Sequence, residues 1–222
     1  MQASPAQELR GWAHQLGVTL DAEMATKLLR LLDELEQWNR AYNLTAIETR
    51  AAMISTHLLD SLAASPELAG AHIADLGTGA GFPGLPLAIA RPELRFTLID
   101  ATAKKVRFVA HAARALGLGN VEAVQARAES MQPAAPFDTV TARAVAPLGT
   151  LAALARPLSR PGTRLVALKG KRPTAELATI PEDWELKGVR EVAVPTLGAE
   201  RCLVTLIARA ASARGASSPV TA

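Results

Sequence analysis

The chain has 222 residues, of which 49% are hydrophobic and 20% charged, a composition typical of a folded globular protein and not of a disordered one. A single cysteine, Cys202, excludes an internal disulfide and a cysteine-based zinc site. The formal net charge is +3, and the charges are unevenly distributed along the chain. Residues 1–72 carry 5 basic and 9 acidic side chains, while residues 73–222 carry 19 basic and 12 acidic ones. The basic second part favours a polyanionic partner.

The first part of the chain, residues 1–70, is predicted to form an amphipathic helical cap. Residues 4–7 (Ser-Pro-Ala-Gln) have the N-cap, N1 and N3 residues of a helix start. Apolar residues then recur at helical spacing over residues 20–38. The motif Thr45-x-x-Glu48 has the spacing of a capping box, which predicts a third helix from there to about residue 65.

From residue 72 onward, short apolar or β-branched runs alternate with helical segments. The runs predicted as strands are 73–76, 96–100, 121–125, 137–142, 164–168, 184–194 and 202–208, and the predicted helices are 84–91, 102–116 and 147–157. This alternation predicts an α/β domain over residues 71–209, with a mostly parallel sheet covered on both faces. The last two strands follow each other directly, so they are expected to form an antiparallel hairpin at one sheet edge. We expect the small, polar tail 210–222 to be disordered.

A glycine-rich loop, DLGTGAGFPG at residues 75–84, joins the first strand of this domain to its helix. Residues 79–84 match the G-x-G-x-x-G dinucleotide fingerprint, whereas residues 75–81 match the Asp-x-Gly-x-Gly-x-Gly loop of S-adenosylmethionine-dependent methyltransferases. A pyrophosphate needs N–H donors and no nearby anion, but Pro83 removes a donor and Asp75 adds a carboxylate. S-adenosylmethionine is therefore favoured, with a dinucleotide and a ligand-free turn as alternatives.

Other candidates follow the remaining strands at their carboxyl ends, where ligands bind in such sheets. Asp100 ends the second strand and suits ribose hydroxyls, a feature that both ligands share. Ala128 and Glu129 follow the third strand, and Arg143 the fourth. The cations at 169–172 follow the fifth strand and suit phosphate contacts. For Glu129, Arg143 and these cations, a solvated surface position remains the alternative.

The residue types also limit which acceptor could be methylated. Methylation of a pyrimidine C5 needs a cysteine nucleophile, but Cys202 lies inside a predicted strand and is expected in the core. No Asn/Asp-Pro-Pro-aromatic clamp for an exocyclic amine follows the fourth strand, and the four histidines show no metal-ligand spacing, so no metal is expected. Guanine N7 has a free lone pair, so its methylation needs no general base. The lack of an obvious general base in this sequence is compatible with N7 as the acceptor.

Several motifs, in the right order, together resemble the RsmG (GidB) family of bacterial 16S rRNA guanine-N7 methyltransferases. They are Trp38-Asn39-Arg40-Ala41-Tyr42-Asn43-Leu44-Thr45, His57-Leu58-Leu59-Asp60-Ser61, the loop DLGTGAGFPGLPLAI, Arg143-Ala144 and Ala167-Leu168-Lys169-Gly170. The similarity is close over residues 35–172. A common family variant has proline in place of Ala80 and leucine in place of Phe82, mild differences that leave the site assignment intact.

The resemblance implies the class I S-adenosylmethionine-dependent methyltransferase fold, a Rossmann-like seven-stranded sheet with a helical N-terminal cap. It also implies methyl transfer to N7 of one guanine of 16S rRNA, at position 527 in the 530 loop. By resemblance the cofactor site includes Gly77, Phe82, Ala128, Glu129 and Arg143, and position in the loop or at a strand end adds Asp75, Gly79, Gly81 and Asp100.

Each position suggests a role for its side chain. Asp75 and the glycines would hold the methionine end of S-adenosyl-L-methionine, Asp100 the ribose, and residues 128–129 the adenine region. Arg143 would lie between cofactor and base, as the best candidate for a positioning role, and no residue is assigned as the catalyst. Expected RNA contacts are Asn39, Arg40, Lys169 and Lys171.

The expected partner is 16S rRNA within the small ribosomal subunit, bound by a monomer. No stretch reaches the roughly 18 apolar residues of a membrane helix, and the opening MQASPAQELR is unlike a signal or transit peptide, so we expect a cytoplasmic protein without membrane contact. The alternatives are a methyltransferase acting on a protein or a small molecule, an NAD-dependent oxidoreductase, and a catalytically silent rRNA-binding factor.

Overall fold

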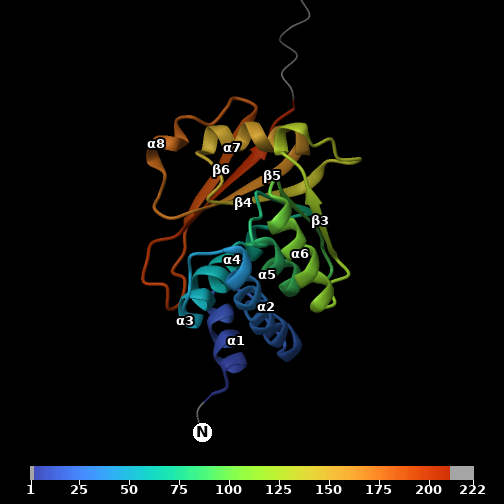
Figure 1. The fold of residues 1–222 in the computed structure, drawn as a ribbon. Coiled ribbons are helices and arrows are strands. Elements are labelled where there is room, and N and C mark those ends of the chain that lie inside the picture. Colours follow the sequence, from blue (N-terminus) through green and yellow to red (C-terminus); the bar gives the residue numbers. More distant parts are fainter. Residues whose placement is uncertain (1–2, 211–222) are drawn as a thin grey trace, which may run out of the picture.

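A seven-stranded sheet in the order β3-β2-β1-β4-β5-β7-β6 organises residues 3–210, the part of the chain that the computed structural model describes (Figure 1). Its strands are β1 (His72–Leu76), β2 (Arg95–Asp100), β3 (Val121–Gln125), β4 (Phe137–Arg143), β5 (Ser159–Lys169), β6 (Trp184–Glu191) and β7 (Cys202–Ala208). Strands β1 to β5 pair in parallel, while β7 runs antiparallel to both β5 and β6. The predicted α/β fold and its antiparallel edge hairpin are confirmed. The tail that we expected to be disordered lies almost wholly outside the described residues.

Helices cover the sheet and form the N-terminal segment below it in Figure 1. They are α1 (Pro5–Gln15), α2 (Ala22–Tyr42), α3 (Arg50–Met53), α4 (Asp60–Leu62), α5 (Gly84–Ala90), α6 (Ala103–Ala115), α7 (Leu148–Ala155) and α8 (Thr174–Leu177), with 3-10 turns η2 (Ser65–Glu67), η3 (Ala128–Ser130) and η4 (Arg156–Leu158). The predicted start of α1 is confirmed, since the Ser4 hydroxyl accepts from the Gln7 N–H and the Gln7 side chain accepts from the Ser4 N–H. Within residues 3–210 no helix is long and apolar enough to cross a membrane.

The third helix begins later than the capping box predicted. Its N-cap is Thr49, which accepts from the Ala52 N–H at 3.3 Å, and not Thr45. The Thr45 hydroxyl lies 3.0 Å from Nε2 of His57 and accepts the Ile47 N–H, so a tertiary contact and a local turn take the place of the predicted cap. The helix continues as a π-helix, η1 (Ile54–Leu59), before α4. Such π segments are rare in proteins, and those that occur are often found at functional sites.

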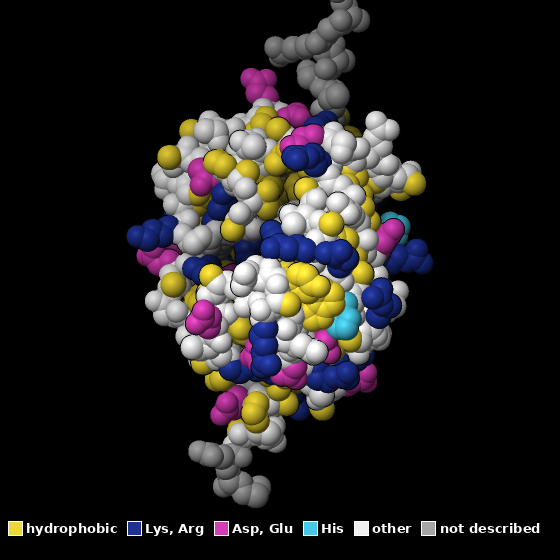
Figure 2. All heavy atoms as spheres, viewed as in Figure 1, with side chains coloured by type: hydrophobic (Ala, Val, Ile, Leu, Met, Phe, Trp, Pro, Cys, Tyr) yellow, Lys and Arg dark blue, Asp and Glu magenta, His cyan; other side chains and the backbone are white. Residues whose placement is uncertain are grey.

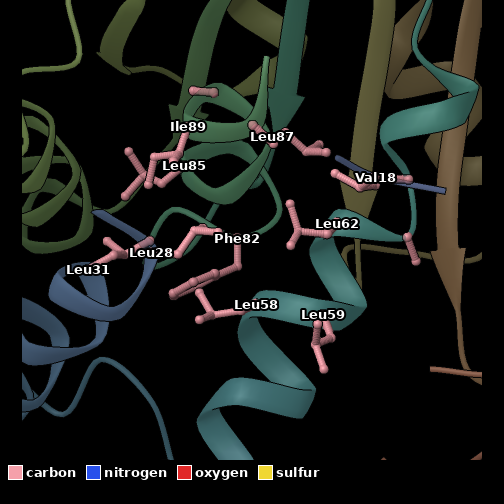
Figure 3. Close-up of a cluster of buried hydrophobic side chains, with 14 of the residues drawn as sticks. Val18, Leu28, Leu31, Leu58, Leu59, Leu62, Phe82, Leu85, Leu87 and Ile89 are labelled. Carbon is pink, nitrogen blue, oxygen red and sulfur yellow. The ribbon is translucent and has the colours of Figure 1, made fainter. Parts of the chain in front are cut away.

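The N-terminal helices and the sheet domain share one hydrophobic core. Figure 3 shows side chains of α2, η1 and α4 packed around Phe82 and the apolar face of α5. Those labelled are Val18, Leu28, Leu31, Leu58, Leu59, Leu62, Phe82, Leu85, Leu87 and Ile89. A second apolar cluster contains Leu148 and Leu151 of α7 together with residues of β1, β4, β5 and β7. The helical segment is therefore built onto the sheet domain through α5, next to the glycine loop.

Candidate functional site

A hollow of about 240 Å³ opens at the carboxyl edge of the parallel strands. Four of the predicted cofactor residues line it: Gly77, Asp100, Ala128 and Glu129. They come from the loop after β1, the end of β2 and the turn after β3, three segments that the sheet order brings side by side. This is the crevice outside the strand ends where ligands bind in doubly wound sheets.

Asp100 is the best oriented of these residues. One oxygen of its carboxylate accepts the Gly79 N–H at 3.0 Å and the other accepts the Thr102 N–H at 2.8 Å, so backbone on both sides fixes the group. A carboxylate has about four lone-pair positions, and the remaining ones can accept from the hydroxyls of a ligand. Glu129, which is exposed, adds a second carboxylate at the hollow. The two carboxylates can accept from hydroxyl and ammonium donors of a ligand.

Gly77, which lines this hollow, has a backbone conformation that favours glycine. Its φ of +66° is in the left-handed region, and a Cβ at this position would lie 2.7 Å from a methyl carbon of Val145. The bare backbone of Gly77 thus faces the hollow, which Val145 narrows from the loop after β4. Gly81 also has a positive φ and packs against Leu85 of α5, so it shapes the loop and does not line the hollow.

Asp75 lies beneath the glycine loop with a fully buried side chain. Its carboxylate accepts from the Thr78 hydroxyl at 2.6 Å, the Gly84 N–H at 2.8 Å and the Thr141 hydroxyl at 3.1 Å. Burial raises the pKa of Asp75 to about 6, although these hydrogen bonds act in the opposite direction. The structure therefore places Asp75 as a tie between the loop and the start of α5, whereas the sequence placed it against the methionine end. The tie also occupies the helix-start N–H that a pyrophosphate would need.

Phe82 and Arg143, two further predicted cofactor residues, lie in a cluster with His57 and do not line the hollow. The rings of Phe82 and His57 stack with centroids 4.6 Å apart, and the guanidinium of Arg143 lies 5.6 Å from the Phe82 ring centroid. Nδ1 of His57 is buried and has no hydrogen-bond partner within residues 3–210. Burial, aided by the charge of Arg143, lowers the pKa of His57 to about 4, so the imidazole is neutral at pH 7.

Asp60 connects this cluster to two other segments. Its carboxylate accepts from Nη1 of Arg143 at 3.1 Å and from Nε of Arg201 at 2.8 Å, and Arg143 also donates to the Thr56 carbonyl at 2.6 Å. Sequence reasoning missed this group. Asp60 and His57 stand in one of the motifs that carry the family resemblance, but nothing local indicated their partners, and Arg201 had no sequence signal.

The expected RNA contacts divide into two kinds. Arg40 and Lys171 are exposed. The amide of Asn39 is used internally, since it donates to the Thr45 carbonyl and accepts the Thr45 N–H. Lys169 donates to the Ala146 carbonyl at 3.0 Å and to Glu176 at 2.7 Å. Asn39 and Lys169 therefore hold loops in place.

Figure 2 shows where basic side chains gather on one face of the molecule. Lys and Arg side chains lie in a depression across the middle of that face, between the helical segment below and the sheet domain above. Such a basic depression is suited to a polyanion.

Comparison with known proteins relates this site to a family. The model of the family described as "GidB: rRNA small subunit methyltransferase G" matches residues 24–204. The ribosomal RNA small subunit methyltransferase G of Stenotrophomonas maltophilia (strain K279a) is 47% identical over 187 residues, which cover 84% of this chain and 88% of that protein. Its counterpart in Xanthomonas campestris pv. campestris (strain B100) is 46% identical over 188 residues, covering 85% and 89%.

Solved structures show the same fold at low sequence identity. An O-methyltransferase from Bacillus cereus in complex with SAH matches with a TM-score of 0.58 and 16% identity, covering 91% of this chain and 97% of that one. A SAM-dependent methyltransferase from Aquifex aeolicus matches with a TM-score of 0.54 and 21% identity, covering 75% and 97%. These likenesses confirm the predicted methyltransferase fold.

Proposed function

Because the chain belongs to the family of rRNA small subunit methyltransferase G, we propose that it transfers a methyl group to N7 of a single guanine of 16S rRNA, position 527 in the 530 loop. Membership in this family makes the protein a 16S rRNA methyltransferase that uses S-adenosylmethionine. The oxidoreductase and the silent binding factor are thereby set aside, as is a protein or small-molecule acceptor.

The residues at the hollow fit the cofactor. Gly77 offers bare backbone, Asp100 offers oriented acceptors for the ribose hydroxyls, and Ala128 with Glu129 lies on the side assigned to the adenine. When bound, the cofactor supplies an electrophilic methyl group on its sulfonium. We assign Asp75, Gly79 and Gly81 to holding the loop in shape beneath it, because their contacts stay within the protein. The oriented carboxylate of Asp100 in the hollow is the observation that carries this assignment.

Methylation of N7 places few chemical demands on this chain. The acceptor lone pair is free in neutral guanine, so no side chain has to remove a proton before attack, and in-line placement is the main requirement. Arg143 is fixed by Thr56, Asp60 and the ring of Phe82, and we assign it the positioning of the target base. His57 is neutral and stacked on Phe82, and we assign it the role of holding the Phe82 ring in place beside Arg143.

The surface supports an RNA substrate bound by a monomer. Exposed Arg40 and Lys171 are our assigned phosphate contacts, with Asn39 and Lys169 acting by holding the adjoining loops. Within residues 3–210 only Tyr42, Val145 and Leu186 are exposed large hydrophobic residues, too scattered for a stable dimer interface. We propose that the protein works in the cytoplasm, on 16S rRNA within the small subunit.

The test is transfer of labelled methyl from S-adenosylmethionine to small-subunit particles from cells lacking this gene, with the modified base mapped. We expect label on one guanine N7, and a large loss of cofactor affinity in Asp100→Ala but not in the exposed control Glu122→Ala. Cofactor binding without label on RNA would reject the RNA target. Unchanged cofactor affinity in Asp100→Ala would reject the site.

A further inference from the structure

Tyr42, the last residue of α2, leaves an aromatic side chain 40% exposed. It is the one exposed aromatic among the large hydrophobic residues of the described chain, since Val145 and Leu186 are aliphatic. Neither the cofactor hollow nor the cluster around Phe82 uses it. The ring is therefore free to contact the substrate RNA.

The ring of Tyr42 is held in place from one side. Its centroid lies 5.2 Å from that of Trp38, one turn earlier in α2, and Trp38 in turn packs against Phe108 and His111 of α6. Helix α2 ends directly after Tyr42, where Asn43 takes a left-handed conformation and donates its N–H to the Asn39 carbonyl. The aromatic stack thus runs from the core to the surface, and part of the Tyr42 side chain remains open to solvent.

A cation is fixed at the backbone of Tyr42. Nζ of Lys104, in the first turn of α6, donates to the Tyr42 carbonyl at 2.8 Å, and its other two N–H donors are not used by this contact. Helix α6 carries Lys104, Lys105, Arg107 and Arg114 and no acidic residue, and Arg40 is exposed two residues before Tyr42. An exposed ring whose own backbone carbonyl holds a lysine ammonium offers what an unpaired nucleotide needs, a face on which its base stacks and a cation for its phosphate.

This surface adjoins the cofactor hollow. Nζ of Lys105, next to Lys104, lies 3.8 Å from the Asp100 carboxylate, which lines the hollow. In Figure 2 the basic side chains of the central depression lie directly above a hydrophobic patch with a histidine beside it. Through Lys104 and Lys105, adjacent residues of α6, the exposed ring of Tyr42 is thus connected to the edge of the hollow assigned to the cofactor.

We propose that Tyr42 and Lys104 form a docking site for one unpaired nucleotide of the substrate RNA close to the methylated guanine. The base stacks on the exposed side of the Tyr42 ring, and the phosphate contacts the Lys104 ammonium. The inference rests on the proposed function, because it names how the RNA substrate of that same site is held.

Replacement of Tyr42 measures the stacking. Tyr42→Leu keeps apolar cover over Trp38 but removes the aromatic face, so we expect the KM for small-subunit particles to rise about tenfold. Tyr42→Phe keeps the face and should retain the wild-type KM, as should Leu186→Ala, a control with an equally exposed side chain on β6. The Kd for S-adenosylmethionine should be unchanged in all three. A wild-type KM in Tyr42→Leu overturns the proposal.

The salt dependence of particle binding separates the two contacts. Lys104→Ala should reduce the slope of log K against log salt by about 1, whereas Tyr42→Leu should leave the slope unchanged and only weaken binding. An unchanged slope in Lys104→Ala would remove the phosphate contact from the proposal.

Crosslinking identifies the partner directly. With Tyr42 replaced by p-azidophenylalanine, irradiation on small-subunit particles should join this position to 16S rRNA. Attachment to a ribosomal protein, or no attachment to the particle, overturns the inference. Failure of the wild-type protein to methylate the same particles would instead overturn the proposed function, so the two failures are distinguishable.

Discussion

At the scale of single residues, two buried ionisable groups near the glycine loop carry opposite pKa shifts. Burial raises the pKa of Asp75 to about 6, and burial with the charge of Arg143 lowers that of His57 to about 4. Both groups are therefore held in less polar surroundings than water, and both favour their neutral form. Their effects on stability run in opposite directions over the same pH range.

The pH dependence of unfolding should reveal this opposition. Because the folded pKa of Asp75 is raised, its contribution is fully present below about pH 4 and is lost as the pH rises through about 6. The contribution of His57 is lost as the pH falls from about 6.5 to 4. Asp75→Asn should therefore gain stability relative to the wild type as the pH rises from about 4 to 6.5, by on the order of 2 to 3 kcal/mol.

Urea unfolding across this pH range measures the effect. The exposed control Glu122→Gln should keep the pH dependence of the wild type. Parallel curves for Asp75→Asn and the wild type would show that the buried carboxylate does not titrate as described.

At the scale of elements, Asp60 ties α4 to the end of β4 and to the segment before β7 through Arg143 and Arg201. Asp60 is 5% exposed, so its loss leaves two partly buried guanidinium groups without their anion. We expect Asp60→Ala to lower the free energy of unfolding by about 2 to 4 kcal/mol. Asp183→Ala, which breaks the more exposed pair with Arg156, should cost about 0 to 1 kcal/mol.

Thermal or urea unfolding of both variants tests this ranking. A double-mutant cycle with Arg201→Ala then isolates the coupling, since the second change should cost less once Asp60 is gone. Equal effects of Asp60→Ala and Asp183→Ala would mean that the central pair does not join the elements.

The chain at the end of β5 offers a second element-scale test, because Lys169, the last residue of the strand, and Lys171, two residues later, have different surroundings. Lys169 is held by Glu176 and the Ala146 carbonyl, whereas Lys171 is exposed. Lys171→Ala should reduce the salt slope of RNA binding by about 1 and leave stability unchanged. Lys169→Ala should instead lower the thermal midpoint, because it removes the ammonium that holds both the Ala146 carbonyl before α7 and the Glu176 carboxylate of α8. Binding isotherms at several salt concentrations and thermal unfolding distinguish the two roles, and identical behaviour of the variants would contradict them.

Over the molecule as a whole, the N-terminal helices and the sheet domain are packed around one shared hydrophobic core. Leucines of α2, η1 and α4 are buried against α5 and Phe82 in a single core (Figure 3). Separating the two parts would expose that core to water, at about 25 cal/mol for each Å² of apolar surface. The glycine loop begins α5, so the same packing that holds the helical segment also supports the site.

We therefore expect the N-terminal helices and the sheet domain to unfold together, in a single transition. Trp12 and Trp38 report on α1 and α2, and Trp184 reports on β6. Trp184→Phe leaves the helical reporters, and the double variant Trp12→Phe/Trp38→Phe leaves the sheet reporter. For each variant, the urea midpoint measured by tryptophan fluorescence should coincide with the urea midpoint measured by circular dichroism on that same variant. A separate early transition of the helical reporters would show that the segment unfolds alone.

Sequence patterns alone predicted the seven strands in chain order, the helices α5, α6 and α7, the edge hairpin and the place of the glycine loop. These features depend on local patterns, namely the period of apolar residues and the turns that glycine permits, which neighbouring residues encode. The motif from Trp38 to Thr45 and the loop at 75–84 also indicated the family, and four of the nine predicted cofactor residues line the hollow.

Which side chains are available to a ligand is visible only in the contacts between elements that are distant in the chain. The carboxylate of Asp75 is hydrogen-bonded within the glycine loop and to the start of α5. Arg143 pairs with Asp60, which is 83 residues away in the chain. Asp60 pairs in turn with Arg201, 141 residues further on. Such partners meet because apolar faces of separate elements pack together, and no local pattern specifies which polar side chains that packing brings into contact.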